Sequence, residues 1–124
     1  RREHEAMAGL ASNLGAPLAS LPRFQAAVGE IEARLMVSAR LLGGATAEVD
    51  AGRPPSPADA GLIKLAVTSN AIRAVASGLE QIGNPGLSRH NPLERHYRDV
   101  LCSRIHSPQN DTIVAVAGRA ALGV

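Results

Sequence analysis

Apolar residues recur every three or four positions along most of the chain, which is the spacing of one face of an α-helix. The clearest series begins just after Leu21-Pro22 and alternates steps of four and three: Phe24, Val28, Ile31, Leu35, Ser38 and Leu42. A second series precedes a break at Gly83: Leu62, Leu65, Ser69, Ile72, Ala76 and Leu79. Neither series alternates apolar and polar residues as a strand does. The pattern therefore predicts two long helices, each with one packing seam.

Prolines mark where the helices begin and end. Residues 50–57 contain three prolines and predict a linker between the two long helices. Ser56 is expected to be the N-cap of the second one. Asn91-Pro92 and Ser107-Pro108 repeat this start signal, so that two shorter helices are expected to open there. One more helix is expected over residues 1–14.

The composition agrees with helices packed on helices. Phe24 and Tyr97 are the only aromatic residues, so Ala, Leu, Val and Ile must fill the core. Ala is the best helix former and lets neighbouring helices approach closely. We therefore predict an all-α fold, a four- to five-helix up-and-down bundle that forms a single domain over residues 1–124.

Charge and cysteine content narrow the class of protein. The formal net charge is only +2, with acidic and basic residues interspersed, so no nucleic-acid partner is expected. No apolar run approaches the ~18–20 residues of a membrane span, so no membrane partner is expected either. Cys102 is the only cysteine, which excludes an internal disulfide and fits a reducing, cytoplasmic location. The sequence starts without Met, and we expect a fragment or processed product of a longer protein.

Most residues able to do chemistry lie between Gln81 and Asp111. Three of the four histidines are here: His90, His96 and His106. Their spacing is not the four residues that place two ligands on one helical face, so no metal site is expected. Cys102 precedes His106 by four residues, but Ser107-Pro108 is expected to interrupt the helix there. We expect a buried, unreactive thiol.

Two further groups in this segment have both a structural and a functional interpretation. Residues 83–86, Gly-Asn-Pro-Gly, could cradle a phosphate with backbone N–H groups, although a helix end is the favoured interpretation. Four arginines could bind phosphate but are more often solvated or paired: Arg89, Arg95, Arg98 and Arg104. Arg98 and Asp99 are expected to form a structural ion pair or lie as surface charges.

Taken together, these residues resemble a known family. A long helix containing Lys64, then Gln81-Ile82-Gly83-Asn84-Pro85-Gly86, then residues 92–99 (PLERHYRD) resembles the C-terminal domain of the acyl-CoA dehydrogenase superfamily over residues 18–123. The resemblance implies a helical bundle that packs against an N-terminal helical domain and a middle β-domain. It also implies an FAD cofactor and a homodimer or homotetramer. Gln81, Gly83 and Gly86 would contact the FAD of a partner subunit.

The turn before the last helix departs from the family's pattern. Counting from Arg98-Asp99, the position of the glutamate that removes the substrate proton falls on Ser107, which is not a carboxylate. His106-Ser107-Pro108 looks more like the His-Asp-Pro turn of the flavin monooxygenase branch, in which the histidine stands near the flavin. By this resemblance His106 is the candidate catalytic residue, and Ser107 and Gln109 are further candidate cofactor-binding residues.

Four functions remain open from the sequence. The first is the C-terminal domain of an FAD-dependent oxidoreductase acting on CH–CH groups, as acyl-CoA dehydrogenases do. The second is the same domain of a flavin monooxygenase. The third is a non-catalytic helical oligomerisation module, and the fourth is a small helical regulator unrelated to the family. In the first two cases the middle β-domain lies outside this sequence, so the chain alone is expected neither to hold FAD tightly nor to turn over.

Overall fold

A computed structural model describes residues 18–124, and the helix expected over residues 1–14 lies outside them. The described part contains four α-helices and three short 3₁₀ turns, with no strand. The α-helices are α2 (Pro22–Asp50), α3 (Pro57–Ile82), α4 (Pro92–Leu101) and α5 (Asn110–Leu122). The 3₁₀ turns are η2 (Leu18–Ser20), η3 (Asn84–Leu87) and η4 (Cys102–Arg104). The all-α prediction is confirmed.

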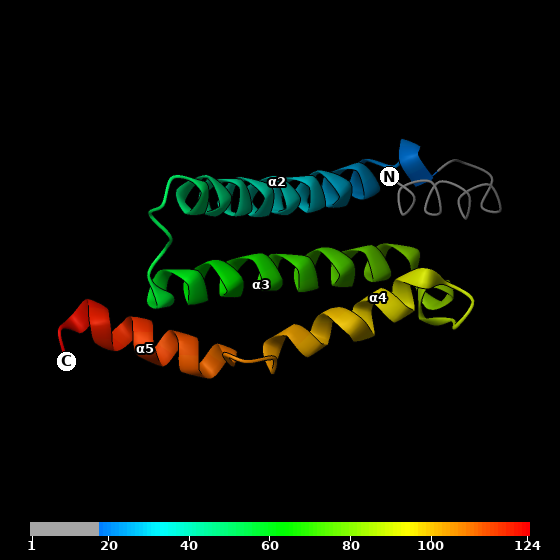
Figure 1. The fold of residues 1–124 in the computed structure, drawn as a ribbon. Coiled ribbons are helices and arrows are strands. Elements are labelled where there is room, and N and C mark those ends of the chain that lie inside the picture. The colour runs from blue at the N-terminus through cyan, green and yellow to red at the C-terminus, as the bar shows by residue number, and fades with distance from the viewer. Residues whose placement is uncertain (1–17) are drawn as a thin grey trace.

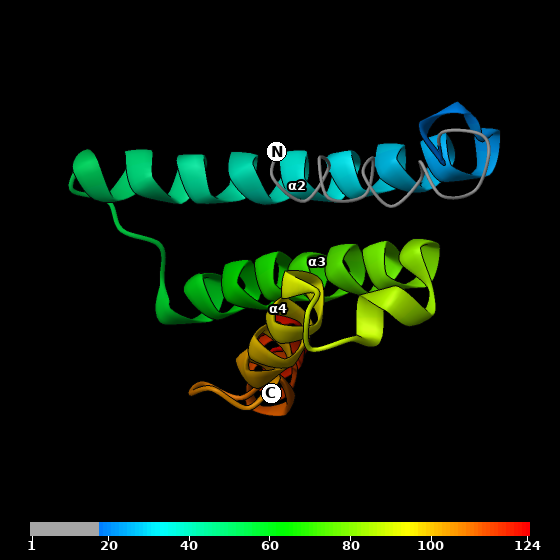
Figure 2. The same ribbon diagram turned by 90° about the vertical axis from the view of Figure 1, so that its right-hand side faces the viewer.

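The central helix of the fold is α3. It runs antiparallel to α2, and the chain then turns back so that α4 and α5 lie end to end along the other side of α3 (Figure 1). The view turned by 90° gives the same order, with α3 between α2 and the α4–α5 row (Figure 2). Because α3 has neighbours on two sides, it positions every other helix.

Local capping groups account for the starts of α3 and α4, as the sequence predicts. The Oγ atom of Ser56 accepts a hydrogen bond from the backbone N–H of Asp59, 3.1 Å away. The Oδ1 atom of Asn91 accepts from the N–H of Leu93 at 2.9 Å. A proline follows each cap and has no N–H left unpaired in the first turn.

The prediction that Ser107-Pro108 opens the last helix is wrong, because α5 begins at Asn110 with Gln109 as its N-cap. The first intrahelical acceptor is the carbonyl of Gln109, which accepts from Ile113 N–H at 3.0 Å. The carbonyl of Pro108 instead accepts a hydrogen bond from the Lys64 side chain. A carbonyl turned toward α3 cannot also point along the axis of a new helix.

The predicted seam of α2 is half correct. Phe24, Ile31 and Ser38 are buried, but Leu35 and Leu42 are 45% and 50% exposed. Ala27 is buried in their place, and Arg34 and Leu41 are half-buried, so the face of α2 toward α3 is centred about one residue earlier than predicted. Apolar residues seven apart therefore form a row beside that face, which we call the α2 stripe: Leu21, Val28, Leu35, Leu42 and Val49. All but Val28 are exposed.

On α3, the predicted single stripe is too simple. Leu79 is buried as expected, but Leu62 is exposed, and the other buried positions of α3 are Gly61, Ala74 and Gly78. A Cβ atom at Gly78 would lie 3.4 Å from a methyl group of Leu93 on α4. Such small residues let large side chains of the neighbouring helices pack directly on the α3 backbone.

One polar contact joins α2 and α3 inside this mostly apolar interface. The Nδ2 atom of Asn70 on α3 donates to the Oγ of the buried Ser38 at 3.3 Å and to the carbonyl of Arg34 at 3.4 Å. Such a pair is satisfied in only one alignment of the two helices, so it favours a single register. The helical spacing predicts Ser38 in the seam of α2, but it does not predict Asn70 as its partner.

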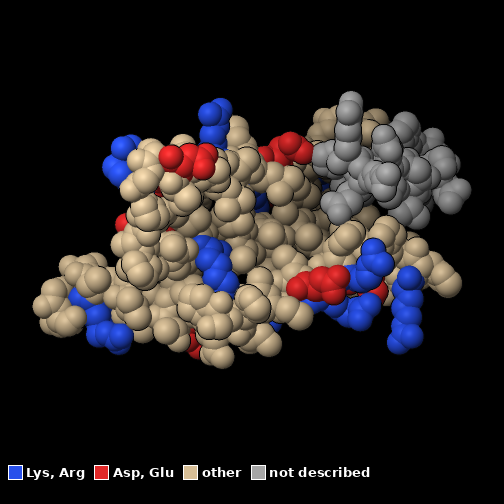
Figure 3. Space-filling view, in the orientation of Figure 1, with Lys and Arg blue, Asp and Glu red and all other residues tan. Residues whose placement is uncertain are grey.

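Charged side chains are scattered over the face seen in Figure 3, with acidic and basic groups interspersed. This matches the small net charge of the sequence. No helix within residues 18–124 is both long and apolar enough to cross a membrane.

Candidate functional site

The first group of candidate residues lies where α3 ends. Gln81 is half-buried in the last turn of α3, and Gly83 is exposed with φ of 76°. Such a positive φ favours glycine, so Gly83 is required by the backbone. Gly86 is buried, and a Cβ atom there would lie 3.0 Å from the Cδ2 of Leu79 and 3.3 Å from the Cγ2 of Ile82. Packing against α3 thus explains why a glycine stands at position 86. Gln81 and Gly83 are the two residues of this group that are not buried.

The second group lies in the turn between α4 and α5, which we define as residues 105–109. His106, Ser107 and Gln109 are all exposed in it. The backbone N–H groups of Ile105 and His106 both donate to the carbonyl of Cys102, and the Ser107-Pro108 peptide bond is cis. The turn therefore leaves an imidazole, a hydroxyl and a carboxamide exposed to solvent within four residues.

A side chain from α3 holds this turn. The Nζ atom of Lys64 donates hydrogen bonds to the carbonyl oxygens of His106 and Pro108, each at 2.5 Å. From the sequence alone, Lys64 is only part of the family likeness, and nothing connects it to the turn. One signal was available: Lys64 is the only lysine in a chain with 13 basic residues.

The structure does not bring the two groups together. They lie at opposite ends of α4, whose ten residues span about 15 Å at 1.5 Å per residue. Figure 1 shows η3 at one end of the α4–α5 row and the α4–α5 turn near its middle. The six candidate residues therefore form two sites, not one.

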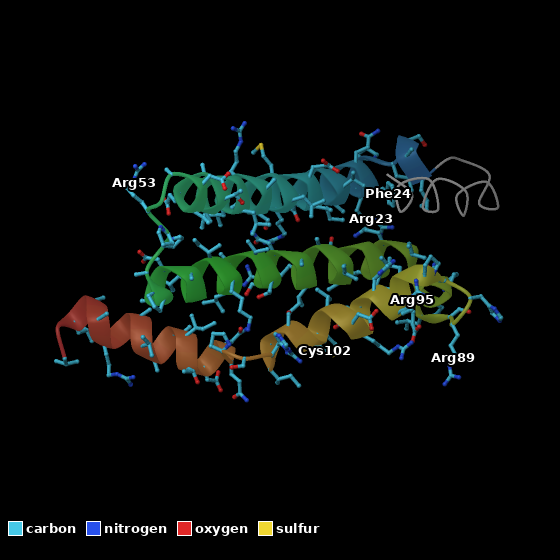
Figure 4. The ribbon with its side chains drawn as sticks, viewed as in Figure 1. Arg23, Phe24, Arg53, Arg89, Arg95 and Cys102 are labelled. Carbon is cyan, nitrogen blue, oxygen red and sulfur yellow. The ribbon has the colours of Figure 1, made fainter. Side chains whose placement is uncertain are left out.

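Of the two interpretations expected for Arg98 and Asp99, the structure agrees with surface charges, and Arg98 pairs with Glu94 instead of Asp99. The Nε atom of Arg98 lies 2.7 Å from the Oε1 of Glu94, one turn earlier on α4, and Asp99 is exposed. Residues four apart face each other on a helix, whereas adjacent residues do not. Because the Arg98 side chain is 65% exposed, the pair contributes at most about 1 kcal/mol. Arg89 and Arg95 are also exposed, and Arg89 projects away from the bundle (Figure 4).

The prediction of a buried thiol is wrong, since Cys102 is exposed just after the end of α4 (Figure 4). Its Sγ atom lies 3.7 Å from the carbonyl of Arg98 and donates to it. A backbone partner of this kind gives the thiol no base to activate it. Over residues 18–124, no group of three His, Cys, Asp or Glu side chains is arranged to hold a metal ion.

The α4–α5 turn has donors of the kind that a dinucleotide needs. It leads into the N-terminus of α5, where Gln109 makes no side-chain capping bond, so backbone N–H groups of the first turn are available. The buried Oδ1 of Asn110, in the first turn of α5, has no hydrogen-bond partner among the described residues. The hydroxyl of Ser107 and the carboxamide of Gln109 add polar groups of the kind that bind phosphate and hydroxyl groups.

Comparisons with known proteins agree on one family. The family model described as acyl-CoA dehydrogenase, C-terminal domain, matches residues 3–122. The "Putative acyl-CoA dehydrogenase YdbM" of Bacillus subtilis (strain 168) is 30% identical over 105 residues, which cover 83% of this chain and 28% of the relative. The mitochondrial short-chain specific acyl-CoA dehydrogenase of Bos taurus is 32% identical over 95 residues, which cover 77% of this chain and 23% of that protein.

Solved structures have the same fold. The acyl-CoA dehydrogenase from Slackia heliotrinireducens DSM 20476 matches with a TM-score of 0.83 at 20% identity, covering 98% of this chain and 32% of its own. The butyryl-CoA dehydrogenase from Megasphaera elsdenii matches with a TM-score of 0.79 at 23% identity, covering 97% and 33%. The chain thus spans about a quarter of the length of the curated relatives. It belongs to the family of acyl-CoA dehydrogenase C-terminal domains.

Proposed function

We propose that this chain is the C-terminal helical domain of a longer, cytoplasmic, FAD-dependent oxidoreductase that acts on the CH–CH group of an acyl-CoA. The observation that carries the proposal is the α4–α5 turn, where His106, Ser107 and Gln109 are exposed together before the N-terminus of α5. The names of the two curated relatives support the acyl-CoA substrate class. The free Cys102 is in keeping with a cytoplasmic location.

In this proposal the chain's residues have separate tasks. Ser107, Gln109 and the first N–H groups of α5 hold the phosphate and ribose groups, because a helix N-terminus favours negative charge. Gln81 and Gly83, at the other end of α4, contact the flavin of a partner subunit. Bound FAD supplies the acceptor for the hydride that leaves the substrate. His106 lies in the turn that faces the flavin and can hold or release a proton at an imidazole nitrogen.

The first prediction is that the full-length enzyme purifies with FAD and that the 124-residue chain does not. A flavin site shared between domains loses most of its contacts when one domain is isolated. The measurement is the flavin absorbance of each protein, with anaerobic addition of a short-chain acyl-CoA to the full-length enzyme. Bleaching of the oxidised flavin supports the dehydrogenase function.

Other outcomes of that experiment select the alternatives. Flavin that is reduced only by a nicotinamide cofactor or a reductase, followed by hydroxylation of a substrate with O₂, assigns the chain to the monooxygenase branch. The resemblance of residues 106–108 to the His-Asp-Pro turn favours this second candidate. A full-length protein without flavin assigns a non-catalytic oligomerisation module. Stoichiometric flavin on the isolated chain contradicts the shared-site proposal.

The second prediction concerns assembly into a homodimer or homotetramer. The α2 stripe leaves four apolar residues exposed in line, and contiguous apolar surface of this kind marks a contact with another protein surface. We therefore expect the full-length wild type to be a dimer or tetramer at about tens of micromolar. The double substitution Leu35→Asp, Leu42→Asp should shift it to a smaller species, as measured by light scattering.

A matched control separates the stripe from exposed apolar residues in general. Val114 and Leu122 on α5 are also exposed, at 50% and 78%, and Val114→Asp, Leu122→Asp adds the same charge. This control should keep the wild-type assembly. A monomeric wild type argues against the proposed oligomer. If only the α5 variant dissociates, the interface is assigned to α5 instead of α2.

A further inference from the structure

Lys64 links the middle of the fold to the candidate flavin site. It lies on α3, and its ammonium reaches two backbone carbonyls 42 and 44 residues further along the chain. These are the carbonyls of His106 and Pro108, on either side of Ser107. Two of the three N–H donors of the ammonium therefore bind the α4–α5 turn, which also carries the exposed side chains of His106, Ser107 and Gln109.

The two carbonyls need a partner from outside the turn. The hydrogen bonds of η4 end with the donation from Ile105 and His106 to Cys102, and those of α5 begin at the carbonyl of Gln109. Between these two points the backbone is not held by helical hydrogen bonds. A cation can satisfy both carbonyls at once, and hydrogen bonds from a charged donor are about twice as strong as those between neutral groups.

The chemistry of lysine suits this task better than that of arginine. An ammonium is a compact charge whose donors diverge, so it can meet two carbonyls that do not lie side by side. A guanidinium is planar and presents parallel N–H groups that match a carboxylate or phosphate. The chain uses arginine at every other basic position, and its single lysine stands at this contact. The hydroxyl of Thr68 donates to the carbonyl of Lys64 at 2.7 Å on the same helix.

We propose that Lys64 is a positioning residue for the flavin site. By fixing the carbonyls of His106 and Pro108 to α3, its ammonium sets where the side chains of His106, Ser107 and Gln109 stand toward the cofactor. The role of Lys64 at a flavin rests on the proposed function, whereas its anchoring of the turn does not. The two parts can therefore be tested separately.

The test uses the full-length enzyme with Lys64→Met, which keeps an unbranched side chain one atom shorter and removes the ammonium. Arg73→Met is the matched control, because Arg73 is an exposed cation on the same helix. Hydrogen exchange should become faster in residues 105–110 of Lys64→Met and remain unchanged in α2 and in the control. A displacement of ~1 Å in a site can lower a rate about 10²-fold, and we expect flavin reduction to slow by at least about 10-fold. Lys64→Arg should restore part of this loss.

A double variant separates positioning from a general loss of stability. If Lys64 acts by placing His106, then adding Lys64→Met to His106→Ala should slow the flavin reaction little further, whereas independent effects multiply. Ile31→Ala, which weakens the α2–α3 interface away from the turn, should lower the melting temperature and leave the rate of flavin reduction in the folded enzyme unchanged. The positioning role is overturned if the rate losses of the two single variants multiply in the double variant. It is also overturned if Ile31→Ala slows flavin reduction as much as Lys64→Met does.

The outcomes also distinguish this inference from the proposed function. If the wild type carries no flavin, the proposed function is wrong. Hydrogen exchange then still decides whether Lys64 anchors the turn. Unchanged exchange at residues 105–110 in Lys64→Met overturns the anchoring. Faster exchange with wild-type flavin affinity and wild-type reduction rate overturns the link between the anchor and the flavin.

Discussion

Replacing Ile113 by Ala is expected to destabilise the 124-residue chain by about 2–5 kcal/mol, the usual cost of removing a buried isoleucine side chain. Ile113 is the buried residue of α5, at 5% exposure. Its Cγ1 and Cγ2 atoms would both lie 3.4 Å from a Cβ atom at Gly61, so the side chain packs directly against the α3 backbone. Since total stability is only about 5–15 kcal/mol, this is a large part of it.

Thermal denaturation followed by circular dichroism measures the effect, and we expect a fall of about 5–15 °C in the midpoint. Val114 is the control, because it follows Ile113 directly and is half exposed. Val114→Ala should change stability by no more than about 0.5 kcal/mol, as surface substitutions do. Equal losses in the two variants would contradict the assignment of Ile113 as the anchor of α5. Hydrogen exchange in Ile113→Ala should rise first in α5, while α2 keeps its protection.

The helix boundaries that the sequence predicts well are those set by neighbouring residues. Ser56 and Asn91 each cap a helix by bonding an N–H two or three residues away, so the sequence around them contains all the information needed. The start of α5 was misplaced because it depends on Lys64, more than 40 residues away in the chain. A local capping rule cannot include a contact of that kind.

The sequence predicts that the helices exist better than it predicts which face of each helix packs against its neighbour. On α2, the buried face and the α2 stripe are both apolar and share an edge, and periodicity alone does not say which of them meets α3. On α3, glycines at buried positions identify the close contacts, but a hydrophobic pattern gives glycine little weight. Gly86 is a related case, because packing against side chains of α3 already requires a small residue there, and the flavin contact that the family resemblance implies for it stays a prediction.

The candidate site was also predicted only in part. The segment carrying His106, Ser107 and Gln109 could be identified from residue types and family likeness, and the structure places all three in one exposed turn. Its separation from Gln81 and Gly83 follows from the helix that the sequence already predicts after Asn91-Pro92, and the structure gives that helix the bounds Pro92–Leu101. The acid that would complete a dehydrogenase site is not in this turn, since residues 106–109 contain no carboxylate.

His106→Ala in the full-length enzyme is expected to slow the reaction of the flavin about 10²-fold, the lower end of what a positioned acid or base contributes. The imidazole is exposed in the α4–α5 turn. Lys64 binds the backbone carbonyl of His106 and does not depend on its side chain. The alanine variant keeps that carbonyl, so the turn remains anchored while the proton donor is lost. Flavin content and melting temperature should therefore stay at the wild-type level. Stopped-flow spectroscopy measures flavin reduction by substrate and reoxidation by O₂ as separate steps.

The step that slows assigns the role of the imidazole. Slower reoxidation with normal reduction places His106 in the oxygen reaction and favours the monooxygenase branch, whereas slower reduction favours a dehydrogenase in which His106 acts on the substrate. His90→Ala is the matched control, because His90 is an exposed histidine in the loop before α4 and should leave both rates unchanged. If His106→Ala also matches wild type in both steps, His106 has no chemical role. The turn then serves only to bind the cofactor, through Ser107, Gln109 and the first N–H groups of α5.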